Sequence, residues 1–118
     1  MKIGTIVDML NAKVLCGEDK LEGTVNSACG CDMMSDVLAF VKEQAVLLTG
    51  LCNPQVVRTA VMMDMRCIVF VRGKQPPAEV VALADEAGIV VLCTNERMYT
   101  ACGKLYSNGL AGGETVNG

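Results

Sequence analysis

The chain has 118 residues, of which 52% are hydrophobic and 19% are charged, and its formal net charge is −3. This length fits one domain, and so apolar a composition excludes a disordered chain. The acidic balance and the lack of a basic cluster argue against nucleic acid and against an anionic membrane surface as partners.

The cysteine and histidine content limits the chemistry of the chain. Its seven cysteines are odd in number and irregularly spaced, which is typical of reduced thiols rather than of a disulfide framework. No apolar run approaches the roughly 20 residues of a membrane span, and the N-terminus lacks the apolar core of a signal peptide. We therefore expect a cytoplasmic protein. The absence of histidine removes the commonest general base, so we do not expect an enzyme.

The first third of the chain is predicted to form short helices and short strands. Apolar residues at helical spacing predict helices over residues 5–11 and 33–42, with Thr5 and Asp32 as their N-caps. Strands are expected at 14–16 and 24–28, a turn at 18–20 and a loop at 29–31.

The centre of the chain carries the clearest pattern. Asn53 followed by Pro54 is a strong helix start, and Gly88 is a helix stop that a strand follows at once. Thr94 and Asn95 are expected to cap the last helix. The expected strands are 45–49, 67–71 and 89–93, and the expected helices are 54–65, 77–87 and a last one that ends near 107.

Strand–helix–strand connections of this length demand parallel pairing and a right-handed crossover. The sequence thus predicts an α/β fold. It consists of a small, mostly parallel sheet with a βαβαβ core flanked by helices, and with the short N-terminal strands at an edge. Residues 1–107 form a single domain in this prediction, and the glycine-rich residues 108–118 form a flexible C-terminal tail.

A small ligand is expected, if anywhere, where the parallel strands end. Helix N-termini with free amides favour anions, so a carboxylate, a phosphate or a nucleotide could bind there. The alternative is that these residues are ordinary caps and turns, and the lack of a Gly-x-Gly-x-x-Gly or Walker pattern favours it. The candidate ligand-binding residues are Thr49, Gly50, Asn53, Gly73 and Thr94.

Cys29 and Cys31 are weak candidates for a metal or redox site. Their C-x-C spacing differs from the C-x-x-C of common zinc and redox motifs, and no second pair follows. The other five cysteines lie within apolar segments and are typical of small core residues. We expect no metal and no cofactor.

The helix over 54–65 is apolar almost all round, which predicts burial on more than one side. Val57, Ala60 and Val61 are expected to form its core stripe. A second subunit is the simplest further cover, so a homodimer is expected. The candidate interface residues are Val56, Met62, Met63, Met33 and Met34.

Several segments resemble a known family. The resemblance covers Leu48–Gly50, the helix that follows, Ile68–Ala84 and Ala87–Thr94, with the last helix as far as Tyr106, and it is a resemblance to a DRTGG domain. Residues 6–25 are similar to the start of that domain and to the N-terminal domain of bacterial HPr kinase. The sequence departs from the family in its eponymous motif, because Cys29-Gly30-Cys31 stands where Asp-Arg-Thr-Gly-Gly is expected.

The resemblance implies a bacterial or archaeal, non-catalytic module. Such domains accompany phosphotransacetylases and CBS-domain pyrophosphatases, where they look structural, regulatory and dimer-forming. The leading hypothesis is therefore a regulatory or scaffolding dimer that works with another protein of a metabolic or redox pathway. The alternatives are a sensor of a nucleotide or other anion and, in third place, a cysteine-based redox or metal-binding protein.

Overall fold

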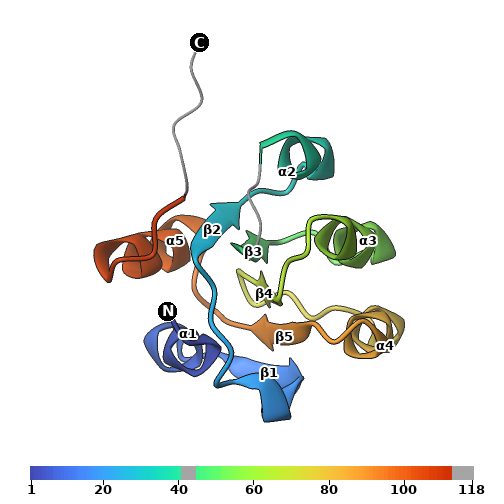
Figure 1. Cartoon of the computed structure of the whole chain (residues 1–118), viewed down its shortest axis with the longest axis horizontal. Helices are drawn as coiled ribbons and strands as arrows, with labels where there is room; N and C mark the ends of the chain where they lie inside the picture. The colour runs from blue at the N-terminus through green and yellow to red at the C-terminus, as the bar shows by residue number, and fades with distance from the viewer. Residues whose placement is uncertain (41–44, 113–118) are drawn as a thin grey trace.

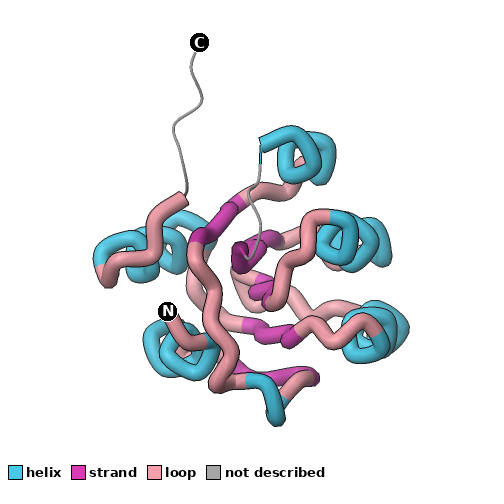
Figure 2. Tube along the Cα trace, viewed as in Figure 1, coloured by secondary structure: helices cyan, strands magenta, loops and turns pink. Residues whose placement is uncertain are grey.

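The computed structural model describes residues 1–40 and 45–112, and it confirms the predicted α/β fold (Figures 1 and 2). Helices and strands alternate along most of the chain. The elements are α1 (Ile3–Leu10), β1 (Lys13–Cys16), the short 3₁₀ helix η1 (Glu18–Lys20), β2 (Ser27–Gly30), α2 (Met34–Phe40), β3 (Ala45–Thr49), α3 (Pro54–Met62), β4 (Cys67–Phe70), α4 (Ala78–Glu86), β5 (Val90–Cys93) and α5 (Met98–Ser107).

A five-stranded sheet forms the centre, in the order β1-β5-β4-β3-β2. Strands β2 to β5 are parallel, whereas β1 pairs with β5 in antiparallel fashion. The two N-terminal strands therefore lie at opposite edges of the sheet, not together at one edge as expected (Figure 1). This arrangement places β2 beside β3, and the C-terminal ends of four parallel strands meet at one edge of the sheet.

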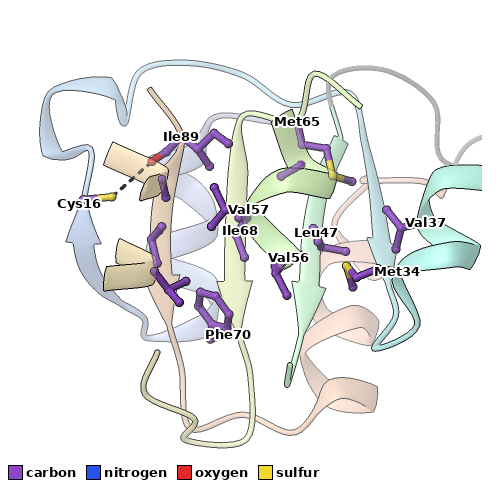
Figure 3. Close-up of a cluster of buried hydrophobic side chains, with 14 of the residues drawn as sticks. Cys16, Met34, Val37, Leu47, Val56, Val57, Met65, Ile68, Phe70 and Ile89 are labelled. Carbon is purple, nitrogen blue, oxygen red and sulfur yellow. Dashed lines mark hydrogen bonds between the residues drawn. The ribbon is translucent and has the colours of Figure 1, made fainter. Parts of the chain in front are cut away.

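Helices cover both faces of the sheet, so the fold has three layers (Figure 1). Helices α2, α3 and α4 cover one face, where Leu47, Ile68 and Phe70 point toward Val56 and Val57 (Figure 3). Helices α1 and α5 cover the other face, over alternate strand residues such as Leu48, Val69 and Leu92. Burial on both faces explains why the parallel strands are apolar without alternation.

The predicted start of α3 and the predicted end of α4 agree with the structure. The Asn53 side chain accepts a hydrogen bond of 3.0 Å from the Gln55 amide, and Pro54 occupies the first turn of α3, as predicted. Gly88 adopts φ +75° just after α4, which is the left-handed conformation of a helix stop. Helix α3 ends at Met62 rather than at residue 65, because Asp64 leaves the helix with φ +53°.

Other predicted boundaries and caps were wrong. Thr5 lies inside α1, which begins at Ile3. Neither Thr94 nor Asn95 caps α5, because Arg97 is the N-cap residue of that helix; the Thr94 hydroxyl instead accepts from the Glu96 amide at 3.2 Å and donates to the Leu10 carbonyl oxygen at 2.7 Å. Cys29 and Gly30 belong to β2 rather than to a loop.

The expected flexible tail is in part a packed segment. Leu110 is buried, and the Ala28 amide donates to the Ala111 carbonyl oxygen at 3.0 Å. The rest of the predicted tail, residues 113–118, and the predicted end of the second helix, residues 41–42, lie outside the described residues. Among the residues that are described, no helix has the length and apolar character needed to span a membrane.

Candidate functional site

The C-terminal ends of β2, β3, β4 and β5 form one polar edge of the sheet. The loops that follow these strands carry Asp32, Gly50, Arg72 and Thr94 in turn. The parallel register places Thr49 beside Phe70, and Phe70 beside Cys93, so the loops are neighbours. The expected convergence of the strand ends is therefore present in the structure.

Asp32 makes the side-chain contacts that connect the loops at this edge. Its Oδ1 accepts hydrogen bonds from the Gly50 amide at 2.7 Å and from the Thr49 hydroxyl at 3.0 Å. Its Oδ2 lies 3.2 Å from Nη2 of Arg72, which forms an ion pair with it. The carboxylate thus joins the ends of three strands. The prediction that Asp32 caps a helix was wrong, because its two carboxylate oxygens bind groups at the ends of β3 and β4 instead.

The surroundings of Asp32 favour its charged form. The hydrogen bond from Gly50 is the main cause that lowers the pKa of this carboxyl group, and Thr49 and Arg72 act in the same direction against partial desolvation. A carboxylate that accepts several hydrogen bonds and faces a guanidinium stays ionised at neutral pH. Asp32 therefore occupies, as a fixed anion, the place where an external anion would meet the same donors.

A tight turn after β4 positions the arginine. Arg72 and Gly73 adopt φ values of +60° and +69°, and their amides donate to the Glu96 and Thr94 carbonyl oxygens at 2.7 and 2.9 Å. This turn carries the guanidinium over Gly50, where any Cβ atom would overlap with it. A Cβ atom at residue 50 would therefore displace the Arg72 guanidinium from its present position beside Asp32.

The five predicted ligand-binding residues all lie at this edge, but their polar groups have partners within the chain. Thr49 and Gly50 donate to Asp32, and the Asn53 side chain caps α3. The Gly73 amide donates to the carbonyl oxygen of Thr94, whose hydroxyl is buried against α1. Asp32 and Arg72 were missing from the predicted ligand-binding residues. Arg72 comes immediately after the predicted parallel strand 67–71, and this position could have identified it, whereas no pattern near Asp32 indicates that its strand pairs with β3.

The cysteine candidates show no sign of a metal centre. Among residues 1–40 and 45–112, no group of three or more histidine, cysteine, aspartate or glutamate side chains is placed to hold a metal ion. Burial and, less strongly, the neighbouring Cys31 and Cys102 raise the pKa of the Cys29 thiol to about 11. The Cys31 sulfur accepts a hydrogen bond from the Met33 amide at 3.3 Å. A thiol with a raised pKa is a poor nucleophile and a poor metal ligand.

The predicted interface residues differ in how far they are exposed to solvent. Val56 and Met34 lie in the core and offer no surface to a second subunit, and Met63 is half-buried against the same core. Met33 and Met62 are exposed, by 60% and 71%.

Helix α3 is rotated relative to the prediction. Val61, expected in the core, is 53% exposed, while Thr59 is fully buried in its place. Among the side chains that the structure describes, the large exposed apolar ones of the α2–α4 layer are Met33, Leu38, Val61, Met62 and Leu83.

Two of the hollows in the described part of the chain lie away from the polar edge and are lined by exposed apolar or aromatic side chains. One of about 350 Å³ is lined by Val57, Arg58, Val61, Met62 and Leu83, between α3 and α4. Another of about 720 Å³ lies beside α5, where Tyr99 and Tyr106 are exposed, and none of the predicted ligand residues lines it.

Comparison with known proteins identifies a family and a similar solved structure. A family model of the DRTGG domain matches residues 5–107. None of the curated proteins compared with the chain matches it in sequence, and the similarity to HPr kinase stays a prediction.

A solved structure shares the fold. It contains the CBS and DRTGG domains of the regulatory region of Clostridium perfringens pyrophosphatase, complexed with its activator diadenosine tetraphosphate. The TM-score is 0.70 at 18% sequence identity, and the match covers 88% of this chain and 45% of that chain. This chain therefore spans less than half the length of that regulatory region. Because the family model extends over most of the sequence, the chain belongs to the DRTGG domain family.

Proposed function

We propose that this chain is a non-catalytic regulatory or scaffolding module that works as a homodimer. The observation that carries this proposal is the set of apolar side chains that the α2–α4 layer leaves in solvent. Val61, Met62 and Leu83 lie together around the hollow between α3 and α4. Neighbouring exposed apolar side chains of this kind mark interaction surfaces, and methionine adapts well to a partner.

A role without catalysis fits the chemistry of the chain. It has no histidine, and the polar groups at the strand ends are bonded to one another. Membership of the DRTGG family supports a regulatory role, since the similar solved structure is a regulatory region. The net charge of −3 disfavours nucleic acid and an anionic membrane as further partners, so the further partner we propose is another protein, of a metabolic or redox pathway.

Light scattering coupled to size exclusion tests the dimer. Met62 and Tyr106 are 71% and 72% exposed on opposite layers, which makes Tyr106→Asp a matched control for Met62→Asp. We expect the wild-type chain and the control to have the mass of a dimer, and Met62→Asp to have the mass of a monomer. A wild-type chain that stays monomeric at high concentration would contradict the proposal.

A second candidate function is the sensing of a nucleotide or another anion. The similar regulatory region is complexed with diadenosine tetraphosphate, and the parallel strand ends of this chain present Thr49, Gly50, Asn53, Gly73 and Thr94. A ligand that binds the native state alone raises the melting temperature. Thermal-shift measurements with diadenosine tetraphosphate, mononucleotides and acyl phosphates are the test. A shift that Arg72→Ala abolishes would support the site, and no shift with any of them would count against it.

A further inference from the structure

The surface of α3 and α4 combines apolar and charged side chains in a self-complementary way. We call it the α3–α4 face and define it by Arg58, Val61, Met62, Glu79, Leu83 and Glu86. Arg58, Val61, Met62 and Leu83 line the hollow of about 350 Å³. Glu79 and Glu86 precede and follow Leu83 by four and three residues, so all three lie on one side of α4.

The charges of this face have no partners among the residues that the structure describes. Arg58, Glu79 and Glu86 are exposed, and within the described part of the chain none of them forms an ion pair or a side-chain hydrogen bond. Helix α3 thus presents a positive charge beside apolar side chains, and α4 presents two negative charges beside Leu83. The α3 half of the face is positive and the α4 half is negative. The α3 half of one copy is therefore complementary in charge to the α4 half of another copy.

The geometry of the two helices suits a two-fold axis. Both helices connect neighbouring parallel strands, so they run side by side in the same direction over one face of the sheet (Figure 1). A two-fold axis between them, parallel to both helices and just outside their exposed surface, places α3 of one copy across α4 of the other in the same direction. Such an isologous contact repeats each interaction twice and closes as a dimer.

The helix lengths then give the register. Each helix has nine residues, and the fifth residues are Arg58 in α3 and Ala82 in α4. With the helix centres aligned, Arg58 lies over the small, exposed Ala82. It then stands between Glu79, three residues before Ala82, and Glu86, four residues after it. In the same alignment Leu83 lies level with Thr59 of the second copy, between Val57 and Val61, which line the hollow.

We propose that the homodimer forms through the α3–α4 face, with Arg58 of one copy between Glu79 and Glu86 of the second copy and Leu83 inserted into the second copy's hollow. The proposal rests on the proposed function, because it names the surface and the contacts of that dimer. Leu83 and Met62 exclude water from the centre, and the charges fix the orientation of the two copies.

Charge reversal tests this arrangement by sedimentation velocity over a range of concentrations. Arg58→Glu places carboxylates against Glu79 and Glu86 in both symmetric contacts, and the double variant Glu79→Lys with Glu86→Lys places ammonium groups against Arg58. We expect each variant alone to dissociate about tenfold or more readily than the wild type. An equimolar mixture should regain wild-type affinity, because both contacts of the mixed pair then join opposite charges. Lys13→Glu, an exposed lysine on β1, is the control for the change in net charge.

The outcomes separate the two proposals. If the wild-type chain dimerises but Arg58→Glu dimerises equally well, or the mixture stays monomeric, the α3–α4 face is wrong while the dimer stands. If the wild-type chain is monomeric at all concentrations, the proposed function itself is overturned. Far-ultraviolet circular dichroism of each variant establishes that it is folded before its mass is interpreted.

Discussion

Replacement of Asp32 by asparagine tests whether this carboxylate joins the strand ends. The substitution keeps an oxygen for the Gly50 amide and the Thr49 hydroxyl but removes the charge and turns an amide toward Arg72. Hydrogen bonds to a charged group contribute about 1.5–3 kcal/mol when protected, but the Asp32 side chain is 48% exposed, so solvent screens a large part. We expect Asp32→Asn to lower the free energy of unfolding by about 1 kcal/mol and Asp32→Ala by about 2 kcal/mol. For a domain of this size, 1 kcal/mol corresponds to about 4 °C in Tm.

The pH dependence of this difference identifies the charge as its source. The folded state lowers the pKa of Asp32, so the stabilisation is fully present above the unfolded pKa of about 3.9 and is lost as the pH falls through the folded value. Urea unfolding of wild type and Asp32→Asn at several pH values is the measurement, with the exposed Asp36→Asn as control. The gap should be full at pH 7 and close toward pH 3. A gap that is the same at both pH values, or an equal loss in Asp36→Asn, would refute the reasoning.

Three further predictions concern single positions. Gly103→Ala should raise the free energy of unfolding by about 0.5–1 kcal/mol, because its Cβ meets no atom within 4 Å and alanine favours the helix; a loss of stability in urea unfolding would contradict this. Gly17→Ala should cost about 2–3 kcal/mol in the same measurement, since Gly17 has φ +86° and an added Cβ would lie 2.8 Å from Cγ2 of Val90; a neutral effect would show that the turn can relax. Cys29, whose pKa is raised to about 11, should react with iodoacetamide at pH 8 on the order of 10²-fold more slowly in the folded than in the urea-unfolded chain, and equal rates by mass spectrometry would exclude its burial.

Those parts of the fold that local chemistry determines were predictable from the sequence. The Asn53–Pro54 pair starts α3, and Gly88 ends α4. These signals act through the backbone conformation and hydrogen bonds of the residues next to them, so they do not depend on the rest of the fold. The rotation of α3 was not predictable in this way. Apolar residues surround the helix, so its periodicity does not say which side meets the sheet, and the structure buries Thr59 while it exposes Val61.

The polar edge of the sheet shows the same limit for the candidate site. Asp32 is separated from Thr49 by 17 residues and from Arg72 by 40. Only the pairing of β2 with β3 brings them together, and no sequence pattern near Asp32 specifies that pairing. A short-range reading assigns such an aspartate to the nearest helix, because capping is what aspartate does there most often. The ligand residues were therefore placed at the correct edge, but the group that occupies their donors was missed.

Because Asp32 already occupies the donors at the strand ends, anion sensing and dimer formation differ in what each must displace. An anion at the strand ends competes with Asp32 for the Gly50 amide, the Thr49 hydroxyl and Arg72, so its binding must first displace a carboxylate already in place. A second copy on the α3–α4 face displaces no partner, because Arg58 and the two glutamates have none within the described chain. The same physics makes Asp32→Asn informative twice over. A variant that is less stable yet binds phosphate or a nucleotide more tightly than the wild type would show that the chain's own carboxylate keeps this edge closed to anions.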